Sequence, residues 1–399
     1  MKDATDRPLL DGLLVLDFSR ILAGPYCTAM LGDLGARVIK VEPPQGDDQR
    51  RMGVIIDGES ASFAMINRNK QGIRLDLGRA EGQRIARQLA ARVDVVVENF
   101  RPGVADKLGI GYERLSAENE RLVYCSVSGF GQRGPLATTP AYDVVVQALS
   151  GLMSITGDPQ GPPTMVGESV GDICAGMFAA WGIVSALYAR ERTGRGRHID
   201  VAMFDALFAM QPTALTQYLY AGTEPRRVGN RHPLSSPFGV YEARDGHFVL
   251  AAANDKLFGA VARVVGQPEL VSDSRFATDG ARSCNDAALR DYIEAWSRVN
   301  DVADVIAAFE AAGVPCAPIQ GIRAAASSSQ VHNRELLVRT QHAVFGDSWL
   351  APQPVRFSST ASNLAVAAPA LGEHTDAVLA ELLGMDAAAL ERLHTEGVA

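Results

Sequence analysis

The sequence predicts an α/β protein with a mostly parallel, Rossmann-like sheet, helices on both faces of that sheet, and a smaller α+β domain. In the first half, short runs rich in Val, Ile and Leu alternate with segments of helical length, which is the pattern of parallel sheets. Near Glu224 the composition changes to a stretch rich in Pro, Gly and Ser, typical of a linker. Ligands of such sheets bind beyond the carboxyl ends of the strands.

The first elements predict a βαβ unit. Residues 13–18 are typical of a buried strand, residues 26–34 of a helix that ends at a glycine, and residues 37–42 of a second strand. In the loop between the first strand and the helix, Gly24 would let the backbone approach a ligand closely, and Pro25 suits a first helical turn.

The alternation continues along the first half of the chain. We expect strands at residues 73–77, 93–99, 122–128 and 197–202, and helices at residues 80–92, 104–108, 142–149 and 204–220. The most apolar run, residues 173–188, is shorter than a bilayer requires and contains glycine, so we interpret it as a buried core helix.

The second half predicts a hairpin and several helices. The hairpin strands are expected at residues 238–241 and 247–252, and helices at residues 257–265, 287–299, 302–312, 375–383 and 387–394. These elements predict a large Rossmann-like domain over residues 1–225, a small domain over residues 226–330, and a C-terminal segment, residues 331–399, that returns to the large domain.

The composition indicates the cellular compartment and the classes of partner that are disfavoured. A net charge of -8 and a pI near 5.5 argue against nucleic acid or an anionic membrane as the main partner. The five cysteines are scattered without C-x-x-C spacing, so neither disulfides nor a metal site are predicted. The polar N-terminus lacks an apolar signal core, which indicates a cytoplasmic protein.

Polar loops supply groups that suit a nucleotide with several phosphates. Residues 67–70, with the sequence NRNK, precede one predicted strand. Asn99, Phe100 and Arg101 follow another, and Lys107 lies further on. Arg and Lys bind phosphate oxygens, and an aromatic surface can take the base. For any single one of these side chains, a solvated surface role is the alternative.

Asp172 is the candidate catalytic residue. It follows a run of small residues and precedes a strongly helical segment, so we expect it at a helix N-terminus. The helix dipole would there favour the ionised carboxylate, which can attack an acyl carbon and hold the acyl group as an anhydride. The alternative is that Asp172 is only an N-cap, and Asp143 has the same capping alternative before its own helix.

A series of short motifs runs along nearly the whole chain. They are residues 20–25 (RILAGP), 31–36 (LGDLGA), 38–42 (VIKVE), 67–70 (NRNK), 98–103 (ENFRPG), 129–131 (GFG), 193–196 (TGRG), 229–233 (GNRHP) and 371–375 (LGEHT). In this order and at these spacings they resemble the family III (formyl-CoA-type) CoA-transferases, within a superfamily that also holds 2-methylacyl-CoA racemases.

The resemblance implies an enzyme that exchanges CoA between an acyl-CoA donor and a free carboxylate, without a permanently bound cofactor or metal. Asp172 falls on the family's nucleophile, which passes through a mixed anhydride and an aspartyl-CoA thioester. The chain looks most similar to members that take CoA from succinyl-CoA to a short dicarboxylate. The resemblance also implies a homodimer of two interlocked chains.

The resemblance further implies which residues contact CoA. They are Ile21, Ala23, Leu75, Asn99, Phe100, Arg101 and Lys107. Ile21 and Ala23 would contact the nucleotide end through their backbone, and Leu75 would pack against the adenine. Lys107 stands where the formyl-CoA-type enzymes have an arginine.

Two departures from the family affect the expected substrate. The formyl-CoA enzymes carry four glycines in a row where this chain has AAAND at residues 251–255, which disfavours formate and oxalate. In the implied substrate pocket, Tyr142 replaces the histidine of the racemases. A neutral tyrosine is a poor base near neutral pH, so a transferase is favoured over a racemase or isomerase. A non-catalytic CoA- or nucleotide-binding regulatory protein is the third alternative, although no G-x-G-x-x-G follows the first strand.

Overall fold

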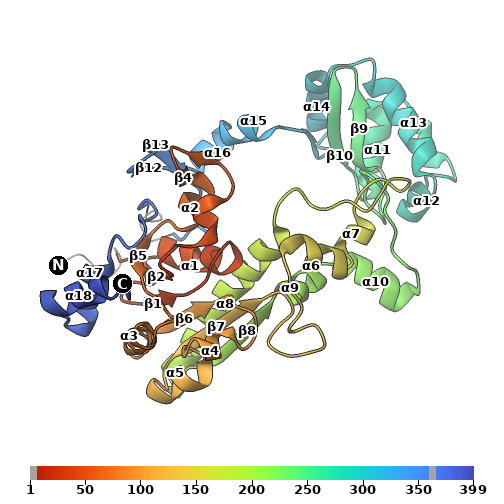
Figure 1. The fold of residues 1–399 in the computed structure, drawn as a ribbon. Coiled ribbons are helices and arrows are strands. Elements are labelled where there is room, and N and C mark those ends of the chain that lie inside the picture. The colour runs from red at the N-terminus through yellow and green to blue at the C-terminus, as the bar shows by residue number, and fades with distance from the viewer. Residues whose placement is uncertain (1–6, 359–364) are drawn as a thin grey trace. The chain divides into compact units, whose positions relative to one another are not determined.

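The computed structural model describes residues 7–358 and 365–399 (Figure 1). The chain divides into two compact units. The first comprises Met1–Leu152, Met165–Thr213 and Gln330–Ala399, and the second comprises Met153–Thr164 and Ala214–Ser329. The short excursion at Met153–Thr164 leaves no signal in the composition, and the boundaries expected at residues 225 and 330 remain predictions.

The first unit is built on a six-stranded parallel sheet. Its strands are β1 (Leu14–Asp17), β2 (Arg37–Glu42), β5 (Lys70–Arg74), β6 (Val95–Glu98), β7 (Val123–Ser128) and β8 (His198–Ala202). They are ordered β5-β2-β1-β6-β7-β8, and every neighbouring pair is parallel. This is the doubly wound order, in which the winding reverses between β1 and β6 and a ligand binds at that point. The predicted fold class is confirmed.

Helices cover both faces of this sheet (Figure 1). They are α1 (Ala23–Asp33), α3 (Ala80–Ala90), α4 (Val104–Lys107), α5 (Tyr112–Glu118), α8 (Val170–Thr193), α9 (Met203–Ala209), α17 (Thr375–Leu383) and α18 (Ala387–Thr395). Successive strand residues point to opposite faces: Leu16 and Val96 join the core under α3 and α17, whereas Val15 and Val97 join the core under α1 and α8. The sheet is therefore buried on both sides.

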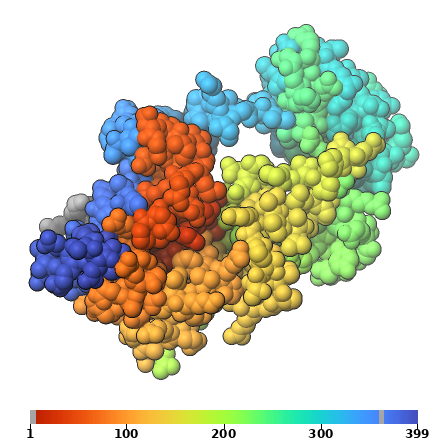
Figure 2. Space-filling model, in the orientation of Figure 1, coloured from red at the N-terminus to blue at the C-terminus, as the bar shows by residue number. Residues whose placement is uncertain are grey.

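The C-terminal segment packs against the N-terminal part of the sheet. In Figure 2 the dark blue helices lie against the orange region of the first unit. The N–H of Arg74, at the end of β5, donates to Thr375 Oγ1 at 3.0 Å, and the Arg74 guanidinium donates to the carbonyl of Ala399 at 2.7 Å. These contacts attach α17 and the chain end to the edge strand.

Helix α8 packs one face against α1. A Cβ on Gly176 would lie only 2.7 Å from the carbonyl oxygen of Ala23, so a side chain there would force the helices apart. The opposite face carries exposed apolar side chains, among them Trp181 (69% exposed) and Tyr188 (68%). The helix is long and apolar enough to span a membrane, a test that core helices of soluble proteins also pass. The predicted buried core helix is thus buried on one face only.

Two predicted elements differ from those observed. Strand β5 begins at Lys70, three residues before the expected start at residue 73, because the polar Lys70 and Gln71 conceal its beginning. The helix expected over residues 204–220 is divided into α9 and α10 (Pro212–Ala221). Pro212 has no N–H to donate to the preceding turn, so it starts a new helix.

The second unit contains an antiparallel three-stranded sheet covered by helices. Its strands are β9 (Phe238–Ala243), β10 (Gly246–Ala251) and β11 (Cys316–Pro318), and its main helices are α11 (Asp255–Val264), α12 (Asp279–Cys284), α13 (Asp286–Ser297) and α14 (Val302–Ala311). The predicted hairpin between β9 and β10 is present. Phe248, Ile293 and Phe309 lie in its core.

The remaining helices and strands are short. They are η2 (Asp48–Arg51), β3 (Ile55–Ile56), β4 (Glu59–Ser60), α2 (Ala61–Ile66), α6 (Asp143–Leu149), α7 (Leu152–Ile155), η3 (Pro268–Ser272), α15 (Ile322–Ala326), α16 (Ser329–Asn333), β12 (Val338–His342) and β13 (Gly346–Leu350).

Candidate active site

Asn99 joins the two loops at the point where the winding of the sheet reverses. Its Nδ2 donates to the carbonyl of Arg20 at 2.7 Å, and its Oδ1 accepts from the N–H of Arg20 at 2.7 Å. Arg20 follows β1 and Asn99 follows β6, which are neighbours in the sheet. The amide therefore fixes the first loop against the second at the expected ligand site.

A pocket of about 280 Å³ opens beside this joint. Leu75 and Phe100, both predicted CoA contacts, line it together with Phe18 and Leu108. The Arg20 guanidinium lies 5.8 Å from the centre of the Phe100 ring. Apolar walls with a cation above an aromatic ring suit a purine base. The wall formed by residues 41–45 had no signal in the sequence, because its members are a strand end and two prolines.

Two predicted cations lie on the segment beyond Phe100. Arg101 and Lys107 are exposed, and α4, which carries Lys107, also contributes Val104 to the pocket wall. Within residues 7–358 and 365–399, neither cation forms an ion pair. Both can therefore meet phosphate oxygens without breaking an internal contact.

Asp172 lies in the first turn of α8, where the N-cap is Ser169. It is therefore not the N-cap, and its carboxylate lies near the backbone N–H of Ala23, at the start of α1. Burial raises the pKa of Asp172 to about 7, the nearby charge of Asp143 adds to this rise, and the N–H of Ala23 opposes it. The expectation that the helix terminus keeps Asp172 fully ionised is wrong, because desolvation outweighs the favourable N–H group.

Asp143 does not cap its own helix. Its Oδ1 accepts from the N–H of Gly171 at 2.6 Å and its Oδ2 from Gln147 Nε2 at 2.6 Å. The carboxylate thus ties the start of α6 to the start of α8, and its capping interpretation is wrong. Tyr142, the N-cap of α6, uses no side-chain hydrogen bond for capping and is 71% exposed.

Comparison with known proteins decides the family. The sequence profile described as CoA-transferase family III matches residues 10–375. This chain belongs to the CoA-transferase family III. It is 46% identical over 351 residues to the acetyl-CoA:oxalate CoA-transferase of Acetobacter aceti, covering 87% of this chain and 89% of that protein. The succinyl-CoA:glutarate CoA-transferase of Mus musculus is 36% identical over 391 residues, covering 98% and 90%.

A solved structure of a similar protein has the same fold. The crystal structure of a CAIB/BAIF family protein from Brucella suis superposes with a TM-score of 0.84 at 39% identity, covering 94% of this chain and 100% of that one. The predicted family is therefore confirmed by the sequence profile and the relatives, and the solved structure confirms the fold. The two relatives are named as transferases of CoA.

Some predicted ligand groups of this family III chain are structural instead. The Arg68 guanidinium pairs with Asp33 at 2.6 Å and the Lys70 ammonium with Asp17 at 3.0 Å, and all four side chains are buried. The assignment of residues 67–70 to phosphate binding is therefore wrong. Gly24 is required by Ser19, whose side chain would lie 2.3 Å from an added Cβ.

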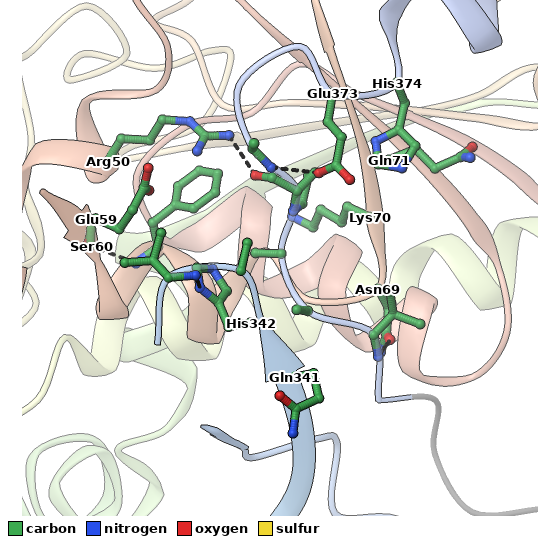
Figure 3. A pocket seen from close by; sticks show the side chains of 18 residues that line it. Arg50, Glu59, Ser60, Asn69, Lys70, Gln71, Gln341, His342, Glu373 and His374 are labelled. Carbon is green, nitrogen blue, oxygen red and sulfur yellow. Dashed lines mark hydrogen bonds between the residues drawn. The ribbon is translucent and has the colours of Figure 1, made fainter. Parts of the chain in front are cut away.

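A second, larger pocket of about 660 Å³ lies at the β5 edge of the sheet (Figure 3). Two of its charged groups already have partners: Arg50 pairs with Glu42 at 2.7 Å and donates to the carbonyl of Pro369, and Glu373 accepts from the N–H of Ala370 at 2.8 Å. These charges are committed to the protein, so the pocket at Phe100 fits a nucleotide better.

Proposed function

We propose that this protein moves CoA from an acyl-CoA to a short dicarboxylate, with Asp172 as the nucleophile. The observation that carries the proposal is the position of the Asp172 carboxylate against the N–H of Ala23. Ala23 ends the loop that Asn99 fixes beside the nucleotide pocket. A nucleotide bound there would have its thioester arm near the start of α1 and α8.

The proposed reaction proceeds by acyl exchange on one carboxylate. An Asp172 oxygen attacks the thioester carbon, the C–S bond breaks, and CoA leaves as the thiolate. The thiolate then attacks the aspartyl carbonyl, which forms an aspartyl-CoA thioester and releases the donor acid as its carboxylate. The acceptor carboxylate attacks this thioester, and the returning thiolate completes the acceptor's acyl-CoA and frees Asp172. The free energy of the donor thioester is thus retained, first in the anhydride and then in the aspartyl-CoA thioester, until the acceptor's acyl-CoA forms.

The ionisation of Asp172 fits this role. Burial holds its pKa at about 7, so a substantial fraction is the carboxylate at neutral pH. A carboxylate in a partly desolvated site is also a stronger nucleophile than one in water. Ala23 stabilises the charged form without removing the effect of burial.

The relatives support a dicarboxylate acceptor. Oxalate and glutarate, which appear in the names of two relatives, both carry two carboxylates. Succinyl-CoA, a dicarboxylate half-thioester, appears as the donor in one of these names. The missing glycine run disfavours oxalate, but the relative at 46% identity is named for it, so oxalate and glutarate both belong among the acceptors tested.

We also propose that the protein works as a homodimer. The outer face of α8 exposes Met177, Trp181, Val184 and Tyr188, which share one side of the helix. Apolar stripes of this kind are usually covered by another protein surface. Light scattering should give twice the chain mass, and replacing Trp181 and Tyr188 by lysine should give monomers. A monomeric wild-type protein contradicts this proposal.

The nucleophile is tested by trapping the covalent intermediate. Succinyl-CoA is mixed with the protein, and mass spectrometry of the digest should show an adduct on the peptide that contains Asp172. Asp172→Asn should lose both the adduct and the transfer of CoA to oxalate or glutarate. An Asp172→Asn variant that keeps transferase activity rules out the proposal. Deuterium incorporation at the α-carbon, without an acceptor acid, would instead indicate the racemase.

A further inference from the structure

Ile21 adopts a backbone conformation that its side chain disfavours. Its φ is 66°, in the left-handed region, where a β-branched residue is a genuine outlier. Leu22 follows as the N-cap of α1 and offers no side-chain capping bond, and Ala23 is the first helical residue. Ile21 is therefore the last residue before the N-cap, and its conformation contributes to the direction of the Ala23 N–H. Such strain persists only where the surroundings hold it.

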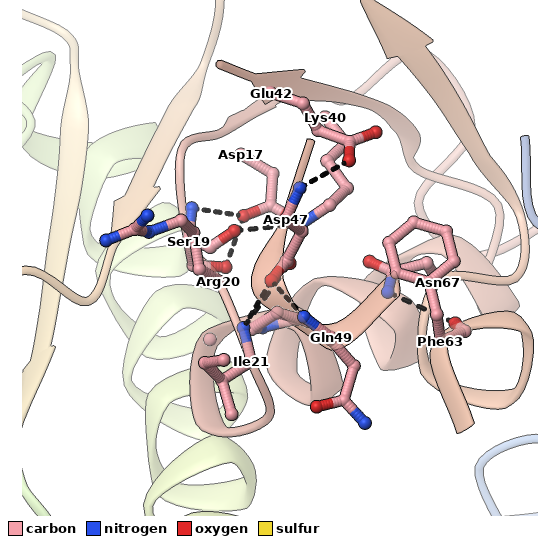
Figure 4. A network of polar contacts seen from close by, with 12 residues as sticks. Asp17, Ser19, Arg20, Ile21, Lys40, Glu42, Asp47, Gln49, Phe63 and Asn67 are labelled. Atoms are coloured by element: carbon pink, nitrogen blue, oxygen red, sulfur yellow. Dashed lines mark hydrogen bonds and ion pairs between the residues drawn. The ribbon is translucent and has the colours of Figure 1, made fainter. Parts of the chain in front are cut away.

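Asp47 provides the acceptor that holds Ile21 (Figure 4). The N–H of Ile21 donates to both carboxylate oxygens of Asp47, at 3.1 and 3.3 Å. The same carboxylate caps η2 by accepting from the N–H of Gln49 at 3.0 Å. Its own N–H donates to Glu42 Oε2 at 3.0 Å. Asp47 is thus fixed on both sides and presents one rigid acceptor to the loop.

Lys40 fixes Asp47 from inside the sheet. The Lys40 ammonium lies 2.9 Å from Asp47 Oδ2 and donates to the carbonyl of Ser19 at 2.9 Å. Both side chains are almost completely buried. Burial alone would raise the pKa of Asp47 and lower that of Lys40, but their mutual attraction reverses both shifts. The pair is therefore charged at neutral pH.

The residues before Ile21 are held in the same way. Asp17 accepts from the N–H of Ser19 at 2.9 Å, and Asn99 holds Arg20 through two bonds of 2.7 Å. Three successive backbone units are therefore held by side chains from the end of β1, the loop after β6 and the N-cap of η2. A loop fixed to this degree suits a group whose direction matters to the chemistry.

We propose that Asp47, held by Lys40, is a positioning residue for CoA transfer: it keeps Ile21 in the left-handed turn and so aims the N–H of Ala23 at the Asp172 carboxylate. The inference rests on the proposed function. Asp47 acts through the loop, since its hydrogen bonds within the described residues are with Ile21, Lys40, Glu42, Gln49 and Arg50.

The test replaces both members of the pair, because removing one would leave an uncompensated buried charge. In K40M/D47L the loop loses its acceptor while the interior stays filled. The matched control is D33L/R68M, which removes an equally buried pair 2.6 Å apart at the other end of α1. Melting temperatures show whether the two variants fold equally well.

K40M/D47L should lose roughly ten-fold or more in kcat, the effect of about 1.4 kcal/mol in activation free energy. The acidic limb of its pH profile should move to higher pH, because the Ala23 N–H no longer opposes burial and Asp143 in setting the Asp172 pKa. D33L/R68M should keep the wild-type limb. A merely structural role would reduce activity in both variants and leave both limbs in place, which overturns the proposal.

A rescue variant tests the strained turn itself. Glycine adopts a φ near 66° without strain, so adding I21G to K40M/D47L should recover part of the lost kcat and move the limb back. No recovery overturns the proposal. If K40M/D47L does not fold, D47N keeps the shape and one acceptor oxygen, and Lys40 still has the Ser19 carbonyl and the charges of Asp17 and Glu42. D47N should then show a smaller loss and a smaller limb shift in the same direction. D172N tests the nucleophile separately from the role of Asp47. An active D172N variant would contradict Asp172 as the nucleophile and with it the proposed function.

Discussion

Asp143 and Asp172 place two carboxyl groups at the adjoining N-termini of α6 and α8. Asp143 accepts the N–H of Gly171 at 2.6 Å, and its charge is the second cause, after burial, of the pKa near 7 of Asp172. The arrangement leaves a substantial fraction of Asp172, the proposed nucleophile, protonated at neutral pH. From the sequence, each aspartate could be related to the helix that follows it but not to the other aspartate.

The first prediction follows from this pair. The attacking species is the carboxylate, so kcat/KM should rise with pH through about 7 as Asp172 loses its proton. Asp143→Asn removes a negative charge but keeps an oxygen for Gly171, so the acidic limb should move to lower pH. Initial rates between acid and weakly alkaline pH measure the limb. An unmoved limb in Asp143→Asn would show that Asp143 does not influence the nucleophile.

The second prediction concerns the bond between Asn99 and Arg20. Asn99→Ala removes both hydrogen bonds that fix the loop after β1. The transition state should lose about 1–3 kcal/mol of stabilisation, which lowers kcat/KM. Asn99→Asp should be at least as harmful, because a carboxylate oxygen replaces the donor that faces the Arg20 carbonyl. Steady-state kinetics and a melting curve separate this effect from unfolding. Wild-type kinetics for both variants would contradict it.

The third prediction concerns Arg101 and Lys107. Replacing both by alanine should raise KM for the acyl-CoA and leave kcat nearly unchanged, because uniform binding of the phosphates is lost. Added salt should weaken the wild type toward the variant. An acyl-pantetheine, which lacks the nucleotide, provides the control and should be used equally well by both proteins. An equal defect with this shorter substrate would show that the cations act elsewhere.

The fourth prediction tests the contact between α1 and α8. In Gly176→Ala the new Cβ would lie 2.7 Å from the backbone carbonyl of Ala23, so the helices must separate and Asp172 must move from Ala23. Activity should fall much more than stability. Gly182→Ala, on the same helix, meets the end of the Ile199 side chain at 3.2 Å and serves as the control. Equal activity of the two variants would contradict the prediction.

Much of the sheet could be predicted from the sequence because β-branched runs mark buried parallel strands directly. The strand at residues 37–42 and the helix at residues 375–383 have the predicted bounds. The start of β5 was predicted three residues too late, because its first residue, Lys70, is charged but lies buried in the sheet. A sequence shows that Lys70 is a cation but not that Asp17 lies 3.0 Å from it.

The site residues could be predicted only through the family resemblance. Asp172, Leu75 and Phe100 followed from the family resemblance, and the structure places the last two in one pocket. The pKa of Asp172 could not be inferred, because desolvation depends on α1, α6 and α8 packing together. Asp47 left no signal either, since an aspartate in a polar loop looks the same whether it is solvated or holds a strained turn.

The start of α1 has a consequence for the kind of ligand this scaffold accepts. Doubly wound oxidoreductases commonly receive a cofactor's diphosphate at the corresponding helix terminus. Here a carboxylate of the chain itself occupies that electropositive end. A nicotinamide dinucleotide with its diphosphate at this position would meet the charge of Asp172 where it normally finds attraction, so we expect such a coenzyme to bind weakly there.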